Sequence, residues 1–583
     1  MTIQINRGVA ALRMLEDPAF CAQWTRLCAR CPWSTSYQLP AFAATWYRVY
    51  VQAFEPVIVT AQTNTAELSG ILCLAASRSN ASLTVAGEEQ SEYQTWVSDP
   101  EHARDFPLEA ILALREEFPN DVIEFRYLPP SVPLDWLADR GVRSNAVLAK
   151  KKRPLLRFAD MEEDSLNKAN NKKRLKVLKK HGEIEFARIT EGDALAAMLD
   201  DFAPCYDLRL GAMHGYEPFA KDPLRRQFQL ELMKQPGLLH VSVLKVGKLL
   251  AAAHVNVCDR QQLHLHLICY NPLLAKHSPG KFHIHLLAQM LIADQYEAID
   301  LTPGGDPYKE RFANAHDTAH ILSFHPTRRS RWKATLRARG DALARRALSA
   351  ARIHPARARD AMQSLRSLPI KQFCSSVAGR LCDRVSFRRA IRLYTKQISR
   401  SDASASPPDL FQRDQIEHLL MYSAPAAGVS RKQFLSDSLD RLEQGQHLYS
   451  RICDGRLLYA GWLMERPSEV FVSRALPGVK LPADRALVMG LCPLDPQPQD
   501  DLGSACLAAM LADLGAVKGI TSAMMAVRPD HHAVPILEAA GFAWESSLFG
   551  GKTYPTSRQS HSPATSSIAV DDNAHPVAST LDG

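Results

Sequence analysis

The order of strand and helix patterns between residues 239 and 301 restricts this chain to few folds. Two apolar runs, 239–245 and 249–257, flank a Val246-Gly-Lys248 turn, and a third run, Leu263-His-Leu-His-Leu-Ile-Cys-Tyr270, alternates. Such alternation is typical of strands that bury one face. A turn-rich segment (271–280), a helical pattern (281–293) and a short strand (298–301) follow. The order predicts an α/β (α+β) fold with a mixed sheet.

The chain of 583 residues is too long for one hydrophobic core, and three to five units are expected. Strand patterns at 57–60, 70–75, 82–85 and 122–127 and a helical pattern at 108–118 predict an N-terminal lobe over 1–150. A lobe at 151–330 repeats this architecture, and a third lobe with strands and helices covers 406–555. Between them lies an Arg-rich helical connector (331–405), and the polar tail 556–583 is expected to be disordered.

Two short helices are predicted from their end signals. One covers 132–140 and ends at Gly141, and the other is a basic helix over 166–180 that ends at Gly182. Glycine is favoured directly after the end of a helix because it adopts left-handed backbone angles at low cost.

Nothing in the sequence reaches the roughly 20 consecutive apolar residues that span a bilayer, and the N-terminus lacks a signal pattern. We therefore expect a cytoplasmic protein. The 12 cysteines are scattered, which favours reduced thiols. Cys28-Ala-Arg-Cys31 stands alone, without the second pair that a zinc site requires, so no metal is expected.

Positive charge is concentrated in one segment. Residues 327–400 hold 20 Lys/Arg and 3 Asp, a net +17, which leaves −9 for the rest of a chain with net charge +8. Apolar residues recur there in two sets, one containing Trp332 and Leu336 and the other Phe387, Ile391 and Tyr394. This basic amphipathic pattern fits three partners: an anionic membrane surface, which would place the protein at the inner face of the cell membrane, RNA, or the chain's own acidic lobes.

The start of the helix after strand 263–270 is the candidate phosphate site. Exposed backbone N–H groups and the helix dipole attract phosphate at a helix N-terminus. The donors would be Gly280 and Lys281, with Ser278 as a third candidate. Plain turn chemistry is the alternative explanation of Pro279-Gly280.

The segment from Gly304 to Phe312, Gly-Gly-Asp-Pro-Tyr-Lys-Glu-Arg-Phe, resembles the "GD-x-x-YK" end of the CelD-type GNAT acyltransferase family, which is associated with cellulose and other exopolysaccharide biosynthesis. The basic helix ending at Gly182, the pair Pro32-Trp33 and the aromatic run Trp46-Tyr47 add to the resemblance, which covers about residues 15–335. FemAB-type aminoacyl transferases share the two-lobed plan. The resemblance implies tandem GNAT-like lobes, with Val241–Ala313 as the acyltransferase core, and acyl transfer from acetyl-CoA or another acyl-CoA to an amine or hydroxyl.

Carried over residue by residue, Asp306, Tyr308 and Lys309 stand where the family's motif stands. A tyrosine could protonate the leaving thiolate, and a lysine could bind phosphate. The alternative is that Tyr308 packs a helix start and Lys309 forms an ion pair.

Three histidines lie on adjacent predicted strands. His264 and His266 share one face because strand side chains alternate, and His254 lies on the neighbouring strand. His254 or His266 could be the general base, the three could bind zinc, or all could be core residues. His283 and His285, two apart on a helix, face different ways.

The third lobe also resembles a GNAT domain. Gly503 and Ala505 match the family's cofactor loop, and Asp500 stands where Arg or Gln is expected. A carboxylate beside a diphosphate is unfavourable, so this lobe could be a scaffolding copy.

The resemblance, together with these candidate residues, implies an acyltransferase that moves an acyl group from acyl-CoA to a polysaccharide precursor or other small acceptor. Two alternatives stay open. One is a FemAB-like transferase that uses aminoacyl-tRNA, and the other is a non-catalytic scaffold for a polysaccharide synthase.

Overall fold

The structure, a computed structural model, describes residues 2–79, 82–161, 169–336, 340, 391–399, 410–424, 429–494, 501–549 and 552–555. Contacts divide the chain into two units. The first contains Met1–Gly379, Pro407–Met464 and Met489–Met510, and the second contains Arg380–Ser406, Glu465–Val488 and Leu511–Gly583.

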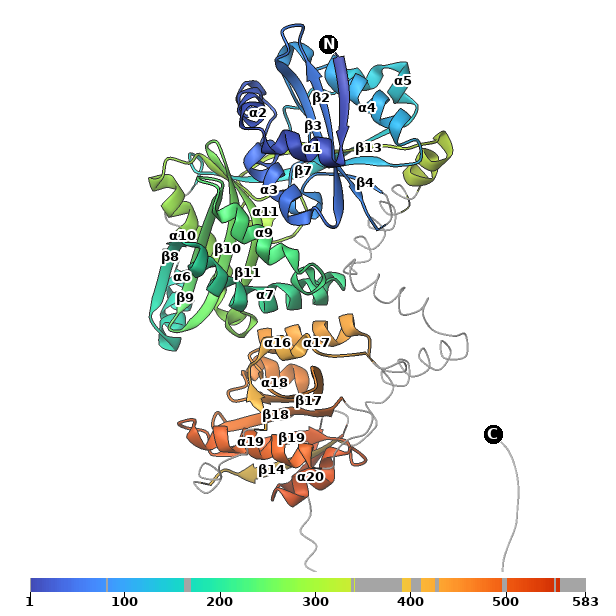
Figure 1. The fold of residues 1–583 in the computed structure, drawn as a ribbon. Helices are drawn as coiled ribbons and strands as arrows, with labels where there is room; N and C mark the ends of the chain where they lie inside the picture. Colours follow the sequence, from blue (N-terminus) through green and yellow to red (C-terminus); the bar gives the residue numbers. More distant parts are fainter. Residues whose placement is uncertain are drawn as a thin grey trace, which may run out of the picture. The chain divides into compact units, whose positions relative to one another are not determined.

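An antiparallel sheet forms the N-terminal part of the first unit (Figure 1). Its order is β1 (Thr2–Arg7), β2 (Phe54–Gln62), β3 (Leu68–Ser77) and β4 (Leu83–Val85), with β5 (Val97–Ser98) paired to β3. The predicted neighbours β2 and β3 are confirmed, whereas β1 was not predicted. The surrounding helices are α1 (Gly8–Glu16), α2 (Pro18–Arg30), α3 (Pro40–Tyr50) and α4 (Asp105–Glu117).

The second sheet carries the candidate site. Its order is β6 (Ile123–Leu128), β13 (Ala315–Phe324), β7 (Ala146–Arg157), β12 (Ala298–Asp300), β11 (Gln262–Tyr270), β10 (Leu249–Asp259), β9 (Leu239–Val246) and β8 (Ile184–Ile189). The predicted hairpin, third strand and fourth strand are therefore confirmed. Residue 150, the predicted boundary between the first two lobes, lies inside β7, and β6 lies before this boundary. Both predicted lobes therefore contribute strands to this sheet.

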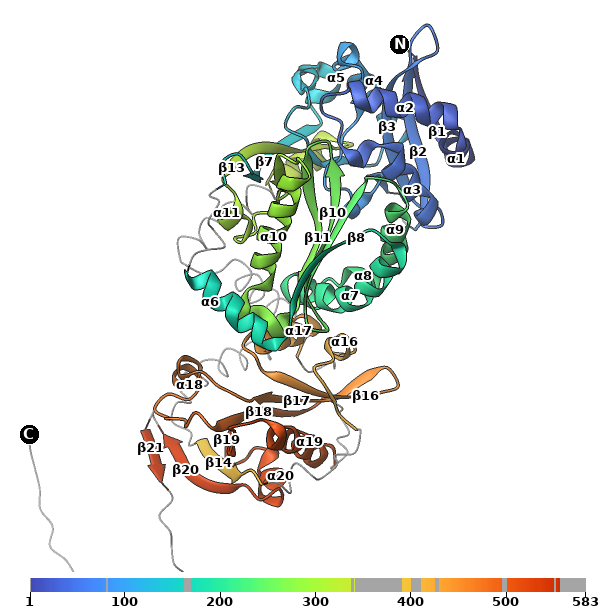
Figure 2. The same cartoon turned by 90° about the vertical axis from the view of Figure 1, so that its left-hand side faces the viewer.

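Helices cover both faces of the second sheet (Figure 2). Helix α10 (Pro279–Ala293) packs on β9 and β10, and α7 (Gly192–His214) packs on the other face of β10 and β11, followed by α8 (Pro218–Lys221) and α9 (Leu224–Met233). Proline at the first position of α10 favours its start, and Gly215, with φ of 72°, ends α7. The predicted basic helix is α6 (Ala169–Leu178), followed by the 3-10 turn η5 (Lys179–His181) and Gly182.

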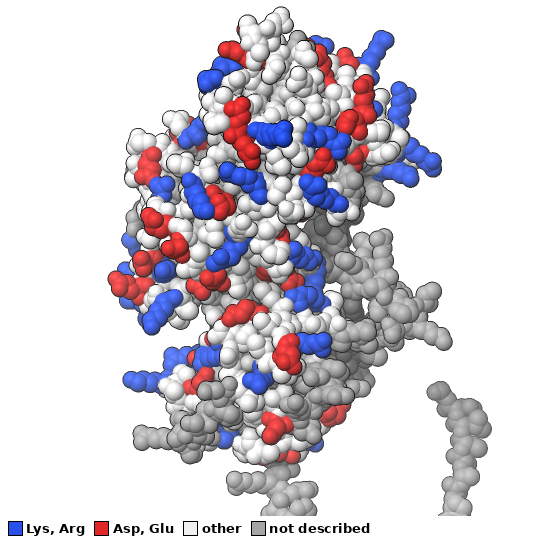
Figure 3. Space-filling model, viewed as in Figure 1, with Lys and Arg blue, Asp and Glu red and all other residues white. Residues whose placement is uncertain are grey.

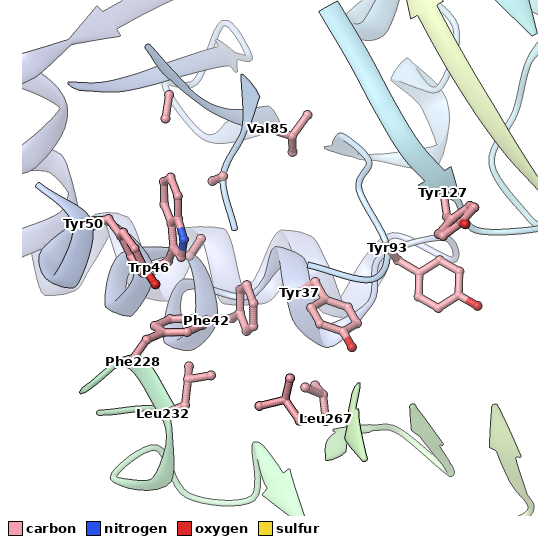
Figure 4. Close-up of a cluster of buried hydrophobic side chains, with 14 of the residues drawn as sticks. Tyr37, Phe42, Trp46, Tyr50, Val85, Tyr93, Tyr127, Phe228, Leu232 and Leu267 are labelled. Carbon is pink, nitrogen blue, oxygen red and sulfur yellow. The ribbon is translucent and has the colours of Figure 1, made fainter. Parts of the chain in front are cut away.

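Aromatic side chains join the N-terminal sheet's helices to the second sheet's helices. Phe42 and Phe228 meet edge to face with ring centroids 5.4 Å apart, and the hydroxyl of Tyr50 donates to Asp222 at 2.6 Å. Figure 4 shows this cluster, in which α3 faces α9 and Leu267 of β11. Such burial is the main stabilising term in folding. The two lobes thus share one core.

The C-terminal segment contributes to both units. The first unit holds β15 (Gln412–Arg413), α16 (Ile416–Leu419), α17 (Arg431–Glu443) and the predicted hairpin β16 (His447–Cys453) and β17 (Arg456–Met464). The second holds α18 (Glu469–Ala475), β19 (Ser522–Val527), α20 (Ala533–Ala539), β20 (Ala543–Phe549) and β21 (Lys552–Pro555). Strand β18 (Arg485–Pro493) pairs in parallel with β19 over its first four residues, and α19 (Leu502–Ala516) connects these two strands.

Two expectations about secondary structure were wrong. The helix expected over 132–140 is a 3-10 turn, η4 (Asp135–Ala138), and Gly141 lies inside α5 (Arg140–Arg143) because the Asp139 carboxylate caps it. Ile391 and Tyr394 lie in strand β14 (Ile391–Gln397) instead of a basic helix. Tyr394 is buried there because β14 pairs with β19 and β20 on its two sides.

Most of the Arg-rich connector and the whole tail 556–583 lie outside the described residues. On the face drawn in Figure 3, basic and acidic side chains are interspersed. In the part of the chain that the structure describes, no helix is long and apolar enough to cross a membrane.

Candidate active site

Strands β11 and β12 part from one another at the centre of the second sheet. They pair in parallel only from Gln262 with Ala298 to His264 with Asp300. Strand β12 ends there, while β11 continues to Tyr270. The pairing of β10 with β11 also shifts register between Val255 and Asn256. Such irregularities locally redirect side chains and often lie beside active sites.

A cleft of about 780 Å³ opens where the two strands part. Its size is typical of sites that hold small molecules or cofactors. Segments far apart in sequence line it, from α6, α7, β10, β11, α10 and α17 and from the loop after β12. The predicted site residues among its lining are His254, Ser278, Gly280, Lys281, Asp306 and Tyr308. The turn before α10 therefore faces a cleft.

The N-terminus of α10 lines this cleft. Arg174 donates to the Ser278 hydroxyl at 2.6 Å, and Lys281 donates to Asn171 at 3.2 Å. Two basic side chains thus lie beside the positive end of a helix dipole, which favours an anion. Ser278, with φ of 57°, takes the left-handed conformation. A Cβ at Gly280 would lie 3.9 Å from Tyr270, so packing alone does not require glycine there.

Asp306 and Tyr308 line the cleft in the loop that follows β12. Burial raises the pKa of the Tyr308 phenol; the nearby Arg209 opposes this shift, and the Asp306 carboxylate adds to it. Tyr308 is therefore protonated at neutral pH and can donate a proton.

Arg209 of α7 also lines the cleft, although no sequence pattern predicted it. It donates to the backbone oxygen of Ile268 at 2.8 Å, and its Nε is buried without a hydrogen bond. No motif marks α7, so no sequence signal placed this arginine beside Tyr308.

Lys309 does not line the cleft. Its ammonium donates to the backbone oxygen and to the hydroxyl of Thr302, both at 3.1 Å, and lies 3.5 Å from Asp306. The side chain is 9% exposed. These contacts fix the loop that carries Tyr308.

The candidate histidines lie on opposite faces of the sheet. His254 stacks on His283 of α10 with ring centroids 3.8 Å apart, and burial beside that ring holds the pKa of His254 well below its usual value. On the other face, His264 contacts Tyr93 and His266 lies 3.6 Å from Glu92. His254 therefore cannot share a metal ion with the other two. No group of three or more His, Cys, Asp or Glu suited to a metal occurs within the described ranges.

A buried ionic network holds the point where β11 and β12 part. Asp300, fully buried, accepts from Tyr93 at 2.7 Å and from Arg153 at 3.0 Å, and it bonds His264 Nδ1 at 2.8 Å. The other nitrogen of His264 bonds Asp259 at 3.0 Å. Because Asp300 is the last residue of β12, this network fixes where the cleft begins.

Stability should fall at mildly alkaline pH because of His264. Burial would lower the pKa of His264, but its bonds to Asp259 and Asp300 outweigh burial and raise the pKa to about 9. A raised folded pKa contributes stability that is complete below the unfolded value of about 6.5 and disappears as pH rises through about 9. The loss is of the order of 3 kcal/mol. Urea midpoints at pH 6.5 and 9.5 measure it, and a His264→Gln protein should lose this pH dependence. Equal wild-type midpoints at the two pH values would contradict the assignment.

Gly503 and Ala505 lie in the first turn of α19 and are not part of the cleft. Gly503 is buried, and the amide of Ala505 donates to Asp501. Asp500 lies outside the described residues. A cofactor role for this turn stays a prediction.

Comparisons agree with the geometry of the second sheet. Residues 167–310 match the family model described as "Acetyltransferase (GNAT) domain". The matched residues include the hairpin β9–β10, strand β11, helix α10 and strand β12. The chain therefore has a mixed α/β, GNAT-like fold.

Solved structures are similar at low identity. FemX is 8% identical (TM-score 0.37; 52% of this chain and 95% of that chain). The C-terminal DUF2156 domain of an Agrobacterium fabrum protein is 14% identical (TM-score 0.35; 52% and 90%). A tandem GNAT protein from the clavulanic acid biosynthesis pathway is 13% identical (TM-score 0.20; 62% and 95%). A search of curated proteins finds no match.

Proposed function

We propose that the protein is an acyltransferase that takes its acyl group from acyl-CoA and transfers it to an amine. One observation carries this proposal: a basic helix N-terminus and a protonated tyrosine line the same cleft between the parted strands. The helix N-terminus can bind the diphosphate of a nucleotide donor, and the tyrosine can protonate a departing thiolate.

In the proposed reaction, the N-terminus of α10, Lys281 and Arg174 bind the diphosphate of the donor. The thioester then lies in the opening between β11 and β12. The acceptor nitrogen attacks the thioester carbonyl, the C–S bond breaks, and Tyr308 protonates the thiolate. His254, which lines the cleft and is neutral because burial lowers its pKa, accepts the proton of the attacking amine.

An aminoacyl-tRNA donor is the second candidate, and α6 with η5 favours it. This segment presents five exposed lysines, and no acidic residue lies between Ala169 and Gly182. Arg174 links the segment to the cleft. Such a surface fits a phosphate backbone, and its binding should weaken steeply with salt. The exposed lysines are Lys172, Lys173, Lys176, Lys179 and Lys180.

The acceptor class and the location follow as further proposals. A precursor of cellulose or another exopolysaccharide that carries an amine, or a related small molecule, would be the acceptor. Both donors occur in the cytoplasm, where we place the protein, with the basic segment 331–400 as its contact to an anionic membrane surface.

Turnover of the full chain tests the proposal. Acetyl-CoA is supplied with a panel of primary amines, and the released thiol is measured with Ellman's reagent. We expect thiol release that depends on the amine. If no amine gives release, but charged tRNA is consumed in a salt-sensitive manner, the second donor is correct. If neither donor is consumed, the protein is a scaffold and the proposal is wrong.

A further inference from the structure

Five buried polar side chains, which we call the file, lie where α10 packs on β9 and β10. His240 and Ser242 belong to β9, His254 and Asn256 to β10, and His283 to α10. The strand register sets Asn256 opposite His240 and His254 opposite Ser242. All five residues are at most 2% exposed. This polar file lies where a GNAT-like sheet and its helix would ordinarily pack apolar residues.

Direct contacts connect the file at its centre. His283 stacks on His254, and its Nε2 lies 3.1 Å from the backbone oxygen and 3.3 Å from the hydroxyl of Ser242. His240 is close enough that its charged form would lower the pKa of both His254 and His283.

Several buried atoms of the file have no hydrogen bond to another protein group. They are Nδ1 of His254, Nδ1 of His283, both ring nitrogens of His240, and both amide atoms of Asn256. Native proteins satisfy more than nine in ten such atoms, commonly with internal water that makes about three bonds. Six unsatisfied atoms in adjacent residues therefore indicate bound water between β9, β10 and α10.

The two ends of the file reach different surroundings. His254 lines the cleft, beside the proposed reaction. At the other end, His240 lies near Arg188 and Asp294, which form a 3.6 Å ion pair with side chains about 40% exposed. The file thus leads from the cleft to a solvent-exposed ion pair.

We propose that this file, from His254 through His283 and Ser242 to His240, carries one proton per turnover from the acceptor to solvent. The inference rests on the proposed function and deepens it, because it assigns an acceptor that arrives as an ammonium. Transfer to an ammonium gives the amide, CoA thiol and one proton. One N–H proton replaces the proton that Tyr308 gives to the thiolate, and the other must leave the cleft.

Neutral imidazoles suit this task. Burial lowers the pKa of His283 to about 3 and that of His240 to about 4. Each ring then relays a proton by accepting at one nitrogen while donating from the other, so no buried cation persists. A phenyl ring at position 283 would keep the stacking but could not relay.

The kinetic experiment uses the full chain, with acetyl-CoA and an amine that supports turnover. His283→Phe should lower kcat about 10- to 100-fold and leave the KM for acetyl-CoA nearly unchanged. His418→Phe is the matched control, because His418 is also buried and bonds a serine hydroxyl (Ser450, 2.8 Å), but outside the file. It should keep wild-type kcat. Wild-type kcat in folded His283→Phe, or an equal loss of kcat in His418→Phe, would overturn the relay.

A structural experiment decides the same point without turnover. Neutron diffraction of crystals of the wild-type chain should show water bonded to His240, Asn256 and Nδ1 of His254. A dry, close-packed space there would overturn the relay even if the enzyme is active. If wild type consumes no acyl-CoA, the proposed function fails, while the diffraction result still decides whether the file is hydrated. Ser242→Ala serves as a second variant if His283→Phe does not fold.

Discussion

The Tyr308→Phe protein should consume acyl-CoA about 100-fold more slowly than wild type, with little change in the KM for the donor. General acid catalysis contributes about 100- to 10,000-fold, and the hydroxyl acts only when the thiolate departs. Phenylalanine keeps the ring that lines the cleft and removes only the proton donor. Steady-state kinetics on the full chain, with thiol release as the readout, measures the effect.

Tyr216→Phe is the matched control for this experiment. Tyr216 is a partly buried tyrosine that lies against Lys221 and does not line the cleft. Its variant should keep wild-type kcat. If Tyr308→Phe also keeps wild-type kcat, Tyr308 is structural and the leaving group takes its proton from another donor.

Asp300→Asn should be the most destabilising single substitution in the network where β11 and β12 part. The amide removes the negative charge that balances Arg153 and His264 in a fully buried place. Breaking a buried ion pair from one side costs about 3 to 5 kcal/mol because the other charge stays buried. For a domain of this size, about 2 to 4 °C per kcal/mol corresponds to a fall in melting temperature of about 6 to 20 °C.

Asp317→Asn provides the control for the network. Asp317 also accepts from Arg153, at 2.9 Å, but its side chain is 33% exposed. Its loss should cost about 1 kcal/mol or less, as for other solvent-screened pairs. Hydrogen exchange by mass spectrometry should show faster exchange in β11 and β12 for Asp300→Asn only. Equal melting of the two variants would contradict the role assigned to Asp300.

Local sequence patterns predicted the second sheet because its elements are continuous and periodic. The alternation of Leu263–Tyr270 and the turns at Gly247 and Gly304-Gly305 mark strands without reference to the rest of the chain. The turn at 278–281 was predicted to face a ligand, and it lines the cleft. By contrast, the run around Tyr394 became a strand because pairing with β19 and β20 outweighed its helical spacing.

Contacts between distant segments could not be predicted in this way. Arg209 reaches the cleft from α7, and Arg153 reaches Asp300 across 147 positions of sequence. His283 and His285 face different ways, as their spacing on a helix predicts, and they contact His254 and Phe312 respectively. The stacking of His283 on His254 follows only from the packing of α10 on β10, which a linear pattern does not contain.

Binding of CoA to the full chain tests the central claim most directly. A ligand at 100 times its dissociation constant adds about 2.7 kcal/mol to stability, so saturating CoA should raise the melting temperature by several degrees. Lys281→Ala, at the N-terminus of α10, should reduce this shift, whereas Lys179→Ala, exposed and outside the cleft, should not. No shift of the wild-type protein at millimolar CoA would contradict the account.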